Sequence, residues 1–208
     1  MRIGIIGSGK IGGTLARLLV RAGHEVAVSN SRGPATLADL VGGLGGAARA
    51  VDVAEAARFG EVVVVAIPFG RYGDLPADAL AGRVVVDATN YYPRRDGHVA
   101  ELDDGTTSSG EMVAAHLPGA RVVKAFNTIY YIRLRDEGRT DRPVAERLAI
   151  PVAGDDGTAK AMVTAMIEQI GFAAVDAGPL AGGRRQQPDT PVYNTPVGPD
   201  EARRLLAS

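Results

Sequence analysis

The residues best suited to chemistry stand near the start of the chain, where a glycine-rich loop follows an apolar run. Gly7-Ser8-Gly9-Lys10-Ile11-Gly12 has the G-x-G-x-x-G spacing, directly after Arg2–Ile6 and directly before a helical run over residues 14–20. In this context the first glycine permits a tight turn, the second lets a pyrophosphate approach the backbone, and the third lets helix and strand pack closely. Exposed amides at the helix N-terminus then bind the phosphates. The loop therefore predicts a dinucleotide site.

The end of the next predicted strand distinguishes between the two nicotinamide dinucleotides. An NAD site has Asp or Glu there, which holds the ribose hydroxyls. This chain has Ser29-Asn30-Ser31-Arg32 instead, without a carboxylate. The guanidinium of Arg32 and the polar side chains beside it can donate hydrogen bonds to a 2′-phosphate. We therefore expect NADP(H) as the cofactor. The alternative is a polar turn before a helix that begins at Pro34.

Short apolar runs and helical patterns alternate along most of the chain. The predicted strands are Arg2–Ile6, Glu25–Val28, Ala47–Ala50, Val62–Ile67, Val84–Asp87, Arg121–Ala125, Ile150–Ala153 and Ala173–Asp176. The predicted helices are Lys10–Ala22, Ala35–Leu44, Asp52–Phe59, Ser109–Leu117 and Gly157–Ile170. This alternation predicts an α/β, Rossmann-like, doubly wound and mainly parallel sheet with helices on both faces.

The alternation breaks at two places, which defines the predicted domain organisation. We assign residues 1–181 to one NADP-binding domain with a polar insertion at about residues 91–107. Residues 182–208 are rich in Gly, Pro and Gln, and we assign them to a C-terminal arm or tail. Such a tail, together with the insertion, could close a slot between two subunits, so we expect a homodimer.

Composition excludes several other kinds of function. A net charge of −1 over 208 residues gives no electrostatic basis for binding nucleic acid or an anionic membrane, and the absence of cysteine excludes thiolate chemistry. The three histidines lack metal-ligand spacing, so we expect no metal site; Asp103-Asp104 is expected to be a polar turn, with Mg²⁺ binding as the alternative. Without a signal peptide or an apolar run of membrane-spanning length, the protein is expected to be cytoplasmic.

Four parts of the sequence resemble the NADPH-dependent reductases of the 8-hydroxy-5-deazaflavin coenzyme (coenzyme F420), and the NADPH-binding cytosolic domain of the STEAP metalloreductases. They are the glycine loop, Ser29–Arg32, Val122–Ile129, and the run Pro151–Asp156 that leads to Asp176–Leu180. The resemblance spans residue 1 to about residue 181, and its last two parts are much more specific than the glycine loop. It implies a reductase that transfers hydride between NADP(H) and a deazaflavin or flavin.

The resemblance also implies roles for individual residues. Positions matching Ser8, Ser31 and Arg32 hold the 2′-phosphate, and main-chain groups matching Ile129 and Tyr131 hold the nicotinamide carboxamide. The strand end that borders the slot between the two rings comprises Ala125, Phe126, Asn127, Thr128 and Ile129.

The fold prediction adds the end of the fourth strand to this site. Ile67 and Pro68 lie where the crevice of a Rossmann sheet opens toward the nicotinamide. Phe69, the next residue, is either a lid over that ring or a filler of the core.

Two features depart from the deazaflavin reductase pattern. That pattern has His at the position of Asn127, whereas the metalloreductase domain, which uses an ordinary flavin, has Asn there. After Leu180, a more aliphatic stretch is replaced by Arg184–Pro188 and later by Tyr193-Asn194. Both departures fall on the side of the second substrate, so the sequence leaves the acceptor open among F420, FMN, FAD and other small molecules.

Hydride transfer between two stacked rings needs no nucleophile or triad, and no catalytic side chain stands out. None of the six tyrosines has Lys four residues on, which excludes the short-chain dehydrogenase pair. Hydroxyacid dehydrogenases and pyrroline carboxylate reductases place their chemistry on an all-helical second domain, for which this chain is expected to be too short. The remaining alternatives are an NADP(H)-binding redox sensor and a reductase of another small molecule.

Overall fold

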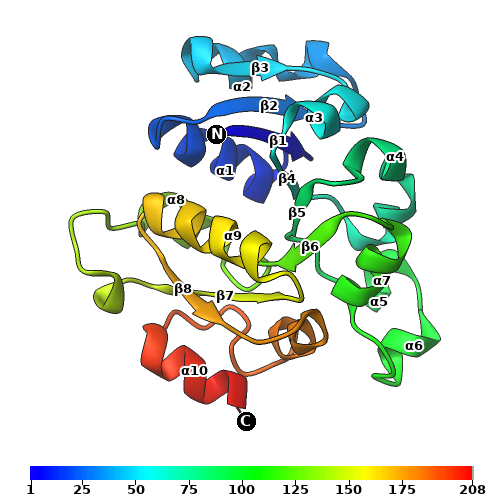
Figure 1. The fold of residues 1–208 in the computed structure, drawn as a ribbon, viewed down its shortest axis with the longest axis vertical. Coiled ribbons are helices and arrows are strands. Elements are labelled where there is room, and N and C mark those ends of the chain that lie inside the picture. The colour runs from blue at the N-terminus through cyan, green and yellow to red at the C-terminus, as the bar shows by residue number, and fades with distance from the viewer. Residues whose placement is uncertain (208) are drawn as a thin grey trace.

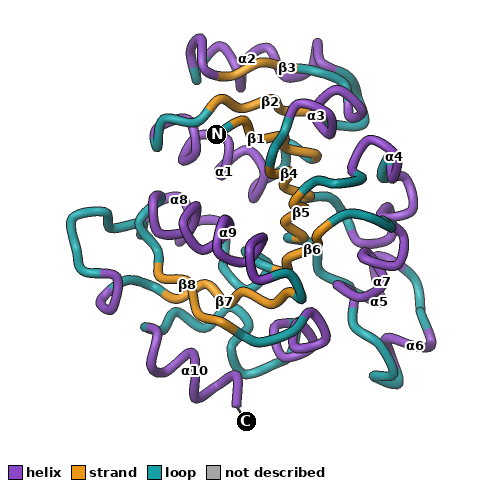
Figure 2. Tube along the Cα trace, in the orientation of Figure 1, coloured by secondary structure: helices purple, strands orange, loops and turns teal. Residues whose placement is uncertain are grey.

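A computed structural model describes residues 1–207 and places eight strands in one sheet (Figures 1 and 2). The strands are β1 (Arg2–Ile6), β2 (Glu25–Ser29), β3 (Ala48–Ala50), β4 (Val62–Val65), β5 (Val84–Asp87), β6 (Arg121–Lys124), β7 (Ala149–Gly154) and β8 (Ala173–Asp176). The helices are α1 (Lys10–Arg21), α2 (Ala38–Gly42), α3 (Val53–Phe59), α4 (Ala77–Leu80), α5 (Pro93–Asp96), α6 (Ala100–Asp103), α7 (Ser109–His116), α8 (Tyr131–Asp136), α9 (Gly157–Gln169) and α10 (Pro199–Ala207). Short 3₁₀ turns are η1 (Pro34–Leu37), η2 (Gly45–Ala47), η3 (Phe69–Asp74), η4 (Val144–Glu146) and η5 (Leu180–Gln186).

The strand order is β3-β2-β1-β4-β5-β6-β7-β8, which confirms the doubly wound α/β prediction. Strands β1 to β6 pair in parallel, and the order reverses between β1 and β4. Strand β7 runs antiparallel to β6, with Ala153 opposite Lys124, and β8 then pairs in parallel with β7. This reversal was not predicted. The chain leaves β6 through the short α8 and a long loop, and re-enters the sheet from the opposite direction.

The boundaries of the predicted elements agree with the structure to within one residue, apart from one strand and one helix. The strand predicted to end at Ile67 ends at Val65, so Ala66 and Ile67 lie beyond the edge of the sheet. The helix predicted over Ala35–Leu44 is divided into η1 and α2. The first turn, with proline at its start, adopts 3₁₀ geometry rather than continuing as one α-helix.

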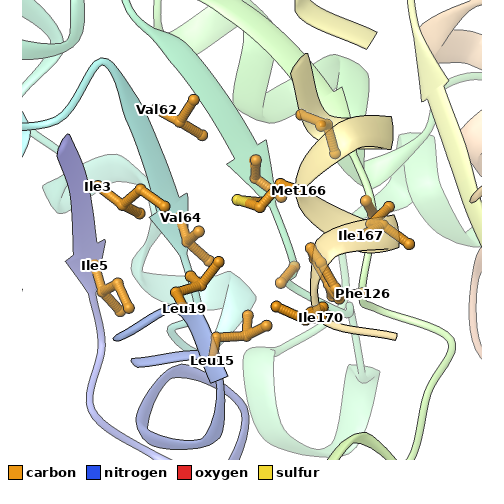
Figure 3. Packing of buried hydrophobic residues seen from close by; sticks show 14 of the residues in the cluster. Ile3, Ile5, Leu15, Leu19, Val62, Val64, Phe126, Met166, Ile167 and Ile170 are labelled. Atoms are coloured by element: carbon orange, nitrogen blue, oxygen red, sulfur yellow. The ribbon is translucent and has the colours of Figure 1, made fainter. Parts of the chain in front are cut away.

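Two apolar layers cover the sheet, one on each face. On one face α1 and α9 pack against alternate residues of β1, β4 and β5, as Figure 3 shows for Leu15, Leu19 and Met166 around Val64. On the other face, α3, α4 and α7 pack against the remaining strand residues, of which Val63 and Val65 are fully buried. The four residues of β4 are buried on both faces, as expected of a central parallel strand.

Residues 182–207 of the tail pack along β7 and β8 (Figure 1). Leu206 of α10 joins a third apolar cluster with Val192 and Val175. The backbone amide of Ala149 donates to Val197, at 2.9 Å, which adds the tail to the start of β7. The domain boundary at residue 181 and the homodimer stay predictions. Within residues 1–207, no helix has the length and apolar character needed to cross a bilayer.

A buried ion pair joins the centre of the sheet to its surroundings. Lys124 Nζ donates to Asp87 Oδ2 at 2.8 Å, and the side chains are 1% and 0% exposed. The same ammonium donates to the Thr89 carbonyl at 2.6 Å and contacts Ser109 Oγ at 3.3 Å. It therefore connects β5, β6 and the first turn of α7. Removing one partner of such a pair leaves an uncompensated buried charge.

We expect Lys124→Met to lower the free energy of unfolding by about 3–5 kcal/mol, because Asp87 then stays buried without its counter-charge. Denaturant unfolding followed by circular dichroism measures this loss. Asp87→Asn added to Lys124→Met should restore part of it, because a neutral amide costs less to bury than a carboxylate. Arg203→Met, which removes the exposed pair with Asp200, is the control and should change stability by less than about 1 kcal/mol. Equal losses of unfolding free energy in Lys124→Met and Arg203→Met would contradict a stabilising role of the buried ion pair.

Candidate functional site

Two adjoining pockets form one cleft at the carboxyl ends of the parallel strands. One has a volume of about 500 Å³ and the other about 350 Å³, and both are bounded by Gly9, Ala66, Ile67 and Pro68. The cleft opens between β1 and β4, where the strand order reverses. Open α/β sheets bind ligands at this switch point. The smaller pocket lies toward the end of β2, and the larger lies over the ends of β5 and β6.

The three glycines of the loop are required for different reasons. Gly7 has a φ of +109°, and a Cβ there would lie 2.3 Å from the Ala66 carbonyl oxygen. A Cβ on Gly12 would lie 1.8 Å from the Gly7 oxygen, so this glycine lets α1 approach β1. At Gly9 a Cβ would meet no heavy atom of residues 1–207 within 4 Å, apart from its chain neighbours. The fold therefore requires Gly7 and Gly12, whereas Gly9 leaves open space above the N-terminus of α1.

That N-terminus is free to bind an anion. Gly9 is the N-cap of α1, and within the described part of the chain no side chain caps the helix. The first turn contains no acidic residue, and Lys10 begins it. The Lys10 ammonium lies 4.6 Å from the centroid of the Tyr131 ring, at the edge of the larger pocket. Unpaired helix amides together with a nearby cation favour the pyrophosphate of a dinucleotide.

Asn30 organises the polar end of the smaller pocket. Its Nδ2 donates to Ser8 Oγ at 3.1 Å, and its Oδ1 accepts from the Arg32 backbone amide at 2.9 Å. These bonds join the glycine loop to the turn after β2, where Ser31 and Arg32 line the pocket. Arg71 lines the same pocket and is paired with Asp74.

Ser29 has a different place from the other residues of this turn. It is fully buried, and its hydroxyl donates to the Ile5 carbonyl at 3.0 Å, so it joins β2 to β1. It does not line either pocket of the cleft. The predicted contact of Ser29 with a cofactor stays a prediction, and its position would let it act through the turn that follows.

A strained turn at the end of β6 forms the inner wall of the larger pocket. Phe126 is 1% exposed and has a φ of +63°, a conformation that bulky residues adopt only when their surroundings enforce it. Asn127 follows and donates to the Gln186 carbonyl at 2.7 Å and to Asn90 Oδ1 at 3.2 Å. Its own Oδ1 is buried and has no hydrogen-bond partner among residues 1–207, so an unsatisfied acceptor belongs to a residue that lines the pocket.

The structure brings most of the predicted site residues together along the cleft. The lining residues among them are Gly7, Ser8, Gly9, Lys10, Ile11, Asn30, Ser31, Arg32, Ile67, Pro68, Asn127, Ile129 and Tyr131. Gly12, Ser29, Ala125 and Thr128 lie behind the lining. The Thr128 carbonyl accepts from the Asn194 backbone amide at 2.9 Å, and Thr128 lines a separate pocket of about 10 Å³. The contacts of these residues with a cofactor stay predictions.

The outer wall of the larger pocket comes from two segments that sequence analysis placed together only across two subunits. Tyr92 and Arg95 come from the insertion, and Tyr193 and Asn194 from the tail. The hydroxyls of Tyr92 and Tyr193 are hydrogen-bonded to each other. Insertion and tail therefore meet over the cleft within one chain, without a second subunit. The only sequence signal was that both segments interrupt the strand–helix pattern.

Asp96 fixes the position of Arg95 at this wall. The Asp96 side chain is 2% exposed and accepts from Nε and Nη2 of Arg95, each at 2.8 Å. The backbone amides of Tyr92 and Gly70 also donate to it, at 2.9 and 3.2 Å. Burial raises the pKa of Asp96, but the hydrogen bonds from Arg95 and the two amides outweigh burial, and the net pKa is lowered.

Several other candidates lie outside the cleft. Phe69 is 1% exposed and stacks on Tyr72, with ring centroids 4.9 Å apart, so it fills the core and is not a lid. Asp103 accepts from the Tyr91 hydroxyl at 2.8 Å and pairs with His98 at 2.9 Å. His98 and Asp103 do not line either pocket of the cleft, and the polar turn is the reading that these contacts favour.

Comparison with known proteins gives the same family as the sequence motifs. Residues 2–91 match the model of the family described as "NADP oxidoreductase coenzyme F420-dependent". The chain is 34% identical to the rat metalloreductase STEAP3 over 185 residues, which is 88% of this chain but only 35% of the length of that protein.

Two solved structures resemble the chain over most of its length. The hypothetical protein SMa0349 from Sinorhizobium meliloti is 32% identical, with a TM-score of 0.82 and 95% of each chain covered. A protein from Arthrobacter sp. FB24, whose structure carries the name of an F420-dependent NADP reductase, is 28% identical, with a TM-score of 0.75; the match covers 88% of this chain and 87% of that one.

The glycine loop yields a test in which folding and ligand binding separate. Gly9→Val should abolish NADPH binding, because the side chain fills the space above the α1 amides, while the free energy of unfolding changes by less than about 1 kcal/mol. Gly12→Ala should instead destabilise the fold by about 1–3 kcal/mol, because its Cβ overlaps the Gly7 oxygen. Calorimetric titration and denaturant unfolding measure the two effects. Normal NADPH binding by Gly9→Val would place the cofactor elsewhere.

Proposed function

Because this chain belongs to the family of coenzyme F420-dependent NADP oxidoreductases, we propose that it transfers hydride between NADP(H) and a deazaflavin or flavin ring. The observation that carries this proposal is the larger pocket, which continues beyond the dinucleotide half of the cleft and is bounded by its own outer wall. The nicotinamide would occupy the part of this pocket near Ile129 and Tyr131, and the part that reaches Tyr92 and Tyr193 is left for a second ring. The pocket has room and walls for a second planar ring.

The polar corner around Arg32 supports NADP(H) over NAD(H). Ser8, Ser31 and Arg32 all line the smaller pocket, and Asn30 fixes the turn that carries them. The corner has no carboxylate at the end of β2 that would repel a 2′-phosphate, although Asp74 faces the pocket while paired with Arg71. A guanidinium and a phosphate form charge-assisted hydrogen bonds.

The residues of the larger pocket would position two rings rather than react. When bound, NADPH supplies the hydride. Pro68, Ala88 and Ile129 provide apolar surface against which a ring can lie, and the Asn127 Oδ1 provides an acceptor for a ring or carboxamide N–H. Hydride transfer requires the reacting carbons to lie about 3–3.5 Å apart with water excluded. A rigid inner wall, enforced by the strained Phe126, serves that requirement.

The cytoplasmic location and the homodimer belong to this proposal as predictions. Since Tyr92 and Tyr193 of one chain already close the pocket, a dimer would not be needed to complete the site. The alternatives of a redox sensor, or of a reductase acting on another small molecule, are separated from the proposal by the acceptor experiment below.

Arg32→Ala should weaken NADPH binding by about 10- to 150-fold. This is the effect of losing about 1.5–3 kcal/mol, the contribution of a hydrogen bond to a charged group. The affinity for NADH, which lacks the 2′-phosphate, should stay within a few-fold. Isothermal titration calorimetry measures both. Arg58→Ala, on the exposed side of α3, is a matched loss of charge outside the cleft. Equal affinities of the unmodified protein for NADPH and NADH would refute the NADP assignment.

The acceptor is identified by mixing the protein with NADPH and, separately, with the deazaflavin coenzyme, FMN, FAD and riboflavin. Loss of the NADPH absorbance band reports turnover, and we expect at least one of these rings to be reduced. Asn127→His should raise the rate with the deazaflavin relative to the flavins several-fold, because His stands at this position in the deazaflavin reductase pattern. If none of the rings is reduced, the sensor or a different reductase replaces this proposal.

A further inference from the structure

The outer wall of the larger pocket carries hydrogen-bond donors that are not among the residues predicted to bind NADP(H). The side chains there that can donate hydrogen bonds are those of Tyr92, Tyr193 and Arg95, and all three residues line the pocket. The Arg95 guanidinium also lies over the Tyr92 ring, 4.9 Å from its centroid. Asp96, the carboxylate that pairs with Arg95, does not line the pocket, so the donors that line it favour a ligand atom that carries negative charge.

The two tyrosines retain a proton for such a ligand. Each hydroxyl has one proton, and the bond between Tyr92 and Tyr193 uses one of the two. Burial and then the neighbouring Tyr92 hydroxyl raise the pKa of Tyr193. Tyr193 therefore remains a neutral donor throughout the physiological pH range. It is suited to hydrogen-bond an anion and not to become one.

Arg95 keeps donors for a ligand as well. Within residues 1–207 its hydrogen bonds run from Nε and Nη2, to Asp96 and to the Asn90 carbonyl, the latter at 2.6 Å. The N–H groups on Nη1 remain. Because the side chain of Asp96 is almost fully buried, the guanidinium is held in place before any ligand arrives. A donor that is already oriented costs no reorganisation when charge develops.

The backbone also holds the wall against the reacting end of the cleft. Asn194, next to Tyr193, has a φ of +55°, and its backbone amide donates to the Thr128 carbonyl at 2.9 Å. This bond joins the tail to the segment that follows β6. Phe126, on that segment, is also at positive φ and also lines the pocket. Strained backbone on both sides of one pocket is typical of a site whose geometry is enforced.

We propose that Tyr193, Tyr92 and Arg95 form a donor wall that binds the acceptor oxygen on which negative charge gathers after hydride transfer. This inference rests on the proposed function and deepens it, because it defines the acceptor class. The acceptor is a planar conjugated ring with a carbonyl oxygen at the edge that faces this wall.

The electron balance explains why an oxygen-directed wall is useful. When the C–H bond at the nicotinamide breaks, its electron pair forms a C–H bond on the acceptor, NADPH becomes NADP⁺, and the acceptor becomes an anion. Conjugation carries the charge to the carbonyl oxygen, where the wall donates hydrogen bonds. A proton from solvent later neutralises the released product. The tyrosines stay protonated throughout, in agreement with the raised pKa of Tyr193.

Turnover of the acceptor that the protein reduces is the first test. Tyr193→Phe should lower kcat by about 100- to 1,000-fold, the usual effect of removing one donor to a developing oxyanion. The Kd for NADPH and the KM for the oxidised acceptor should stay within about threefold, because the negative charge on the acceptor oxygen develops only during hydride transfer. Tyr72→Phe, the same chemical change outside the cleft, should leave kcat unaltered. An unchanged kcat in Tyr193→Phe would overturn the proposal.

A second test needs no turnover and therefore separates this proposal from the proposed function. The probes are 4-nitrophenolate, a planar ring with an oxyanion, and 4-nitroanisole, its neutral ether, each titrated against the NADP⁺-loaded protein. The unmodified protein should bind the phenolate at least about tenfold more tightly, and Tyr193→Phe should remove most of this preference. A preference without reduction of any flavin would uphold the wall and refute the flavin acceptor. No preference in the unmodified protein would overturn the wall.

Discussion

The ammonium of Lys124 fixes the point at which β5 and β6 end and the wall of the cleft begins. It binds Asp87, the last residue of β5, and the carbonyl of Thr89, so that Asn90 is the next residue to emerge. Lys124 is itself the last residue of β6, three residues before Asn127. The inner wall, in which Asn90 and Asn127 exchange hydrogen bonds, is thus anchored from below by one buried ion pair. Separating two buried charges in a low-dielectric interior is costly, so the ion pair restrains the position of the inner wall.

The aliphatic part of the Lys124 side chain lies close to the tail and to α7. A Cβ on Gly183, in η5, would lie 3.4 Å from Cγ of Lys124, and one on Gly110, in α7, would lie 3.6 Å from Cδ. Both segments therefore approach the aliphatic part of this side chain closely. The next residues of the tail place Gln186 against Asn127 and then bring Tyr193 over the pocket. The inner and outer walls of the larger pocket are consequently parts of one packed unit.

The sequence was sufficient where a signal is local. The glycine loop, the turn after β2 and the strand–helix alternation could be read within windows of a few residues, and the structure places them as expected. The ion pair of Lys124 was not predicted, because Lys124 ends a segment that resembles an ordinary apolar strand and its partner Asp87 lies 37 residues away. Tyr92 and Tyr193 are separated by 101 residues, and their meeting depends on the antiparallel entry of β7, which periodicity alone does not encode. Tertiary charge pairing and chain reversal were the unpredictable parts.

The three loop glycines are required for different reasons, so substituting them has different consequences for the amount of protein in a cell. A protein altered at Gly7 or Gly12 is strained, populates unfolded states more, and is exposed to chaperones and proteases that act on such states. A substitution at Gly9 preserves the native packing, so proteases that degrade unfolded protein do not remove the variant. Lesions at that residue would accumulate as abundant, well-folded and inactive protein. Selection on Gly9 therefore acts through catalysis alone, whereas selection on its neighbours acts first through protein abundance.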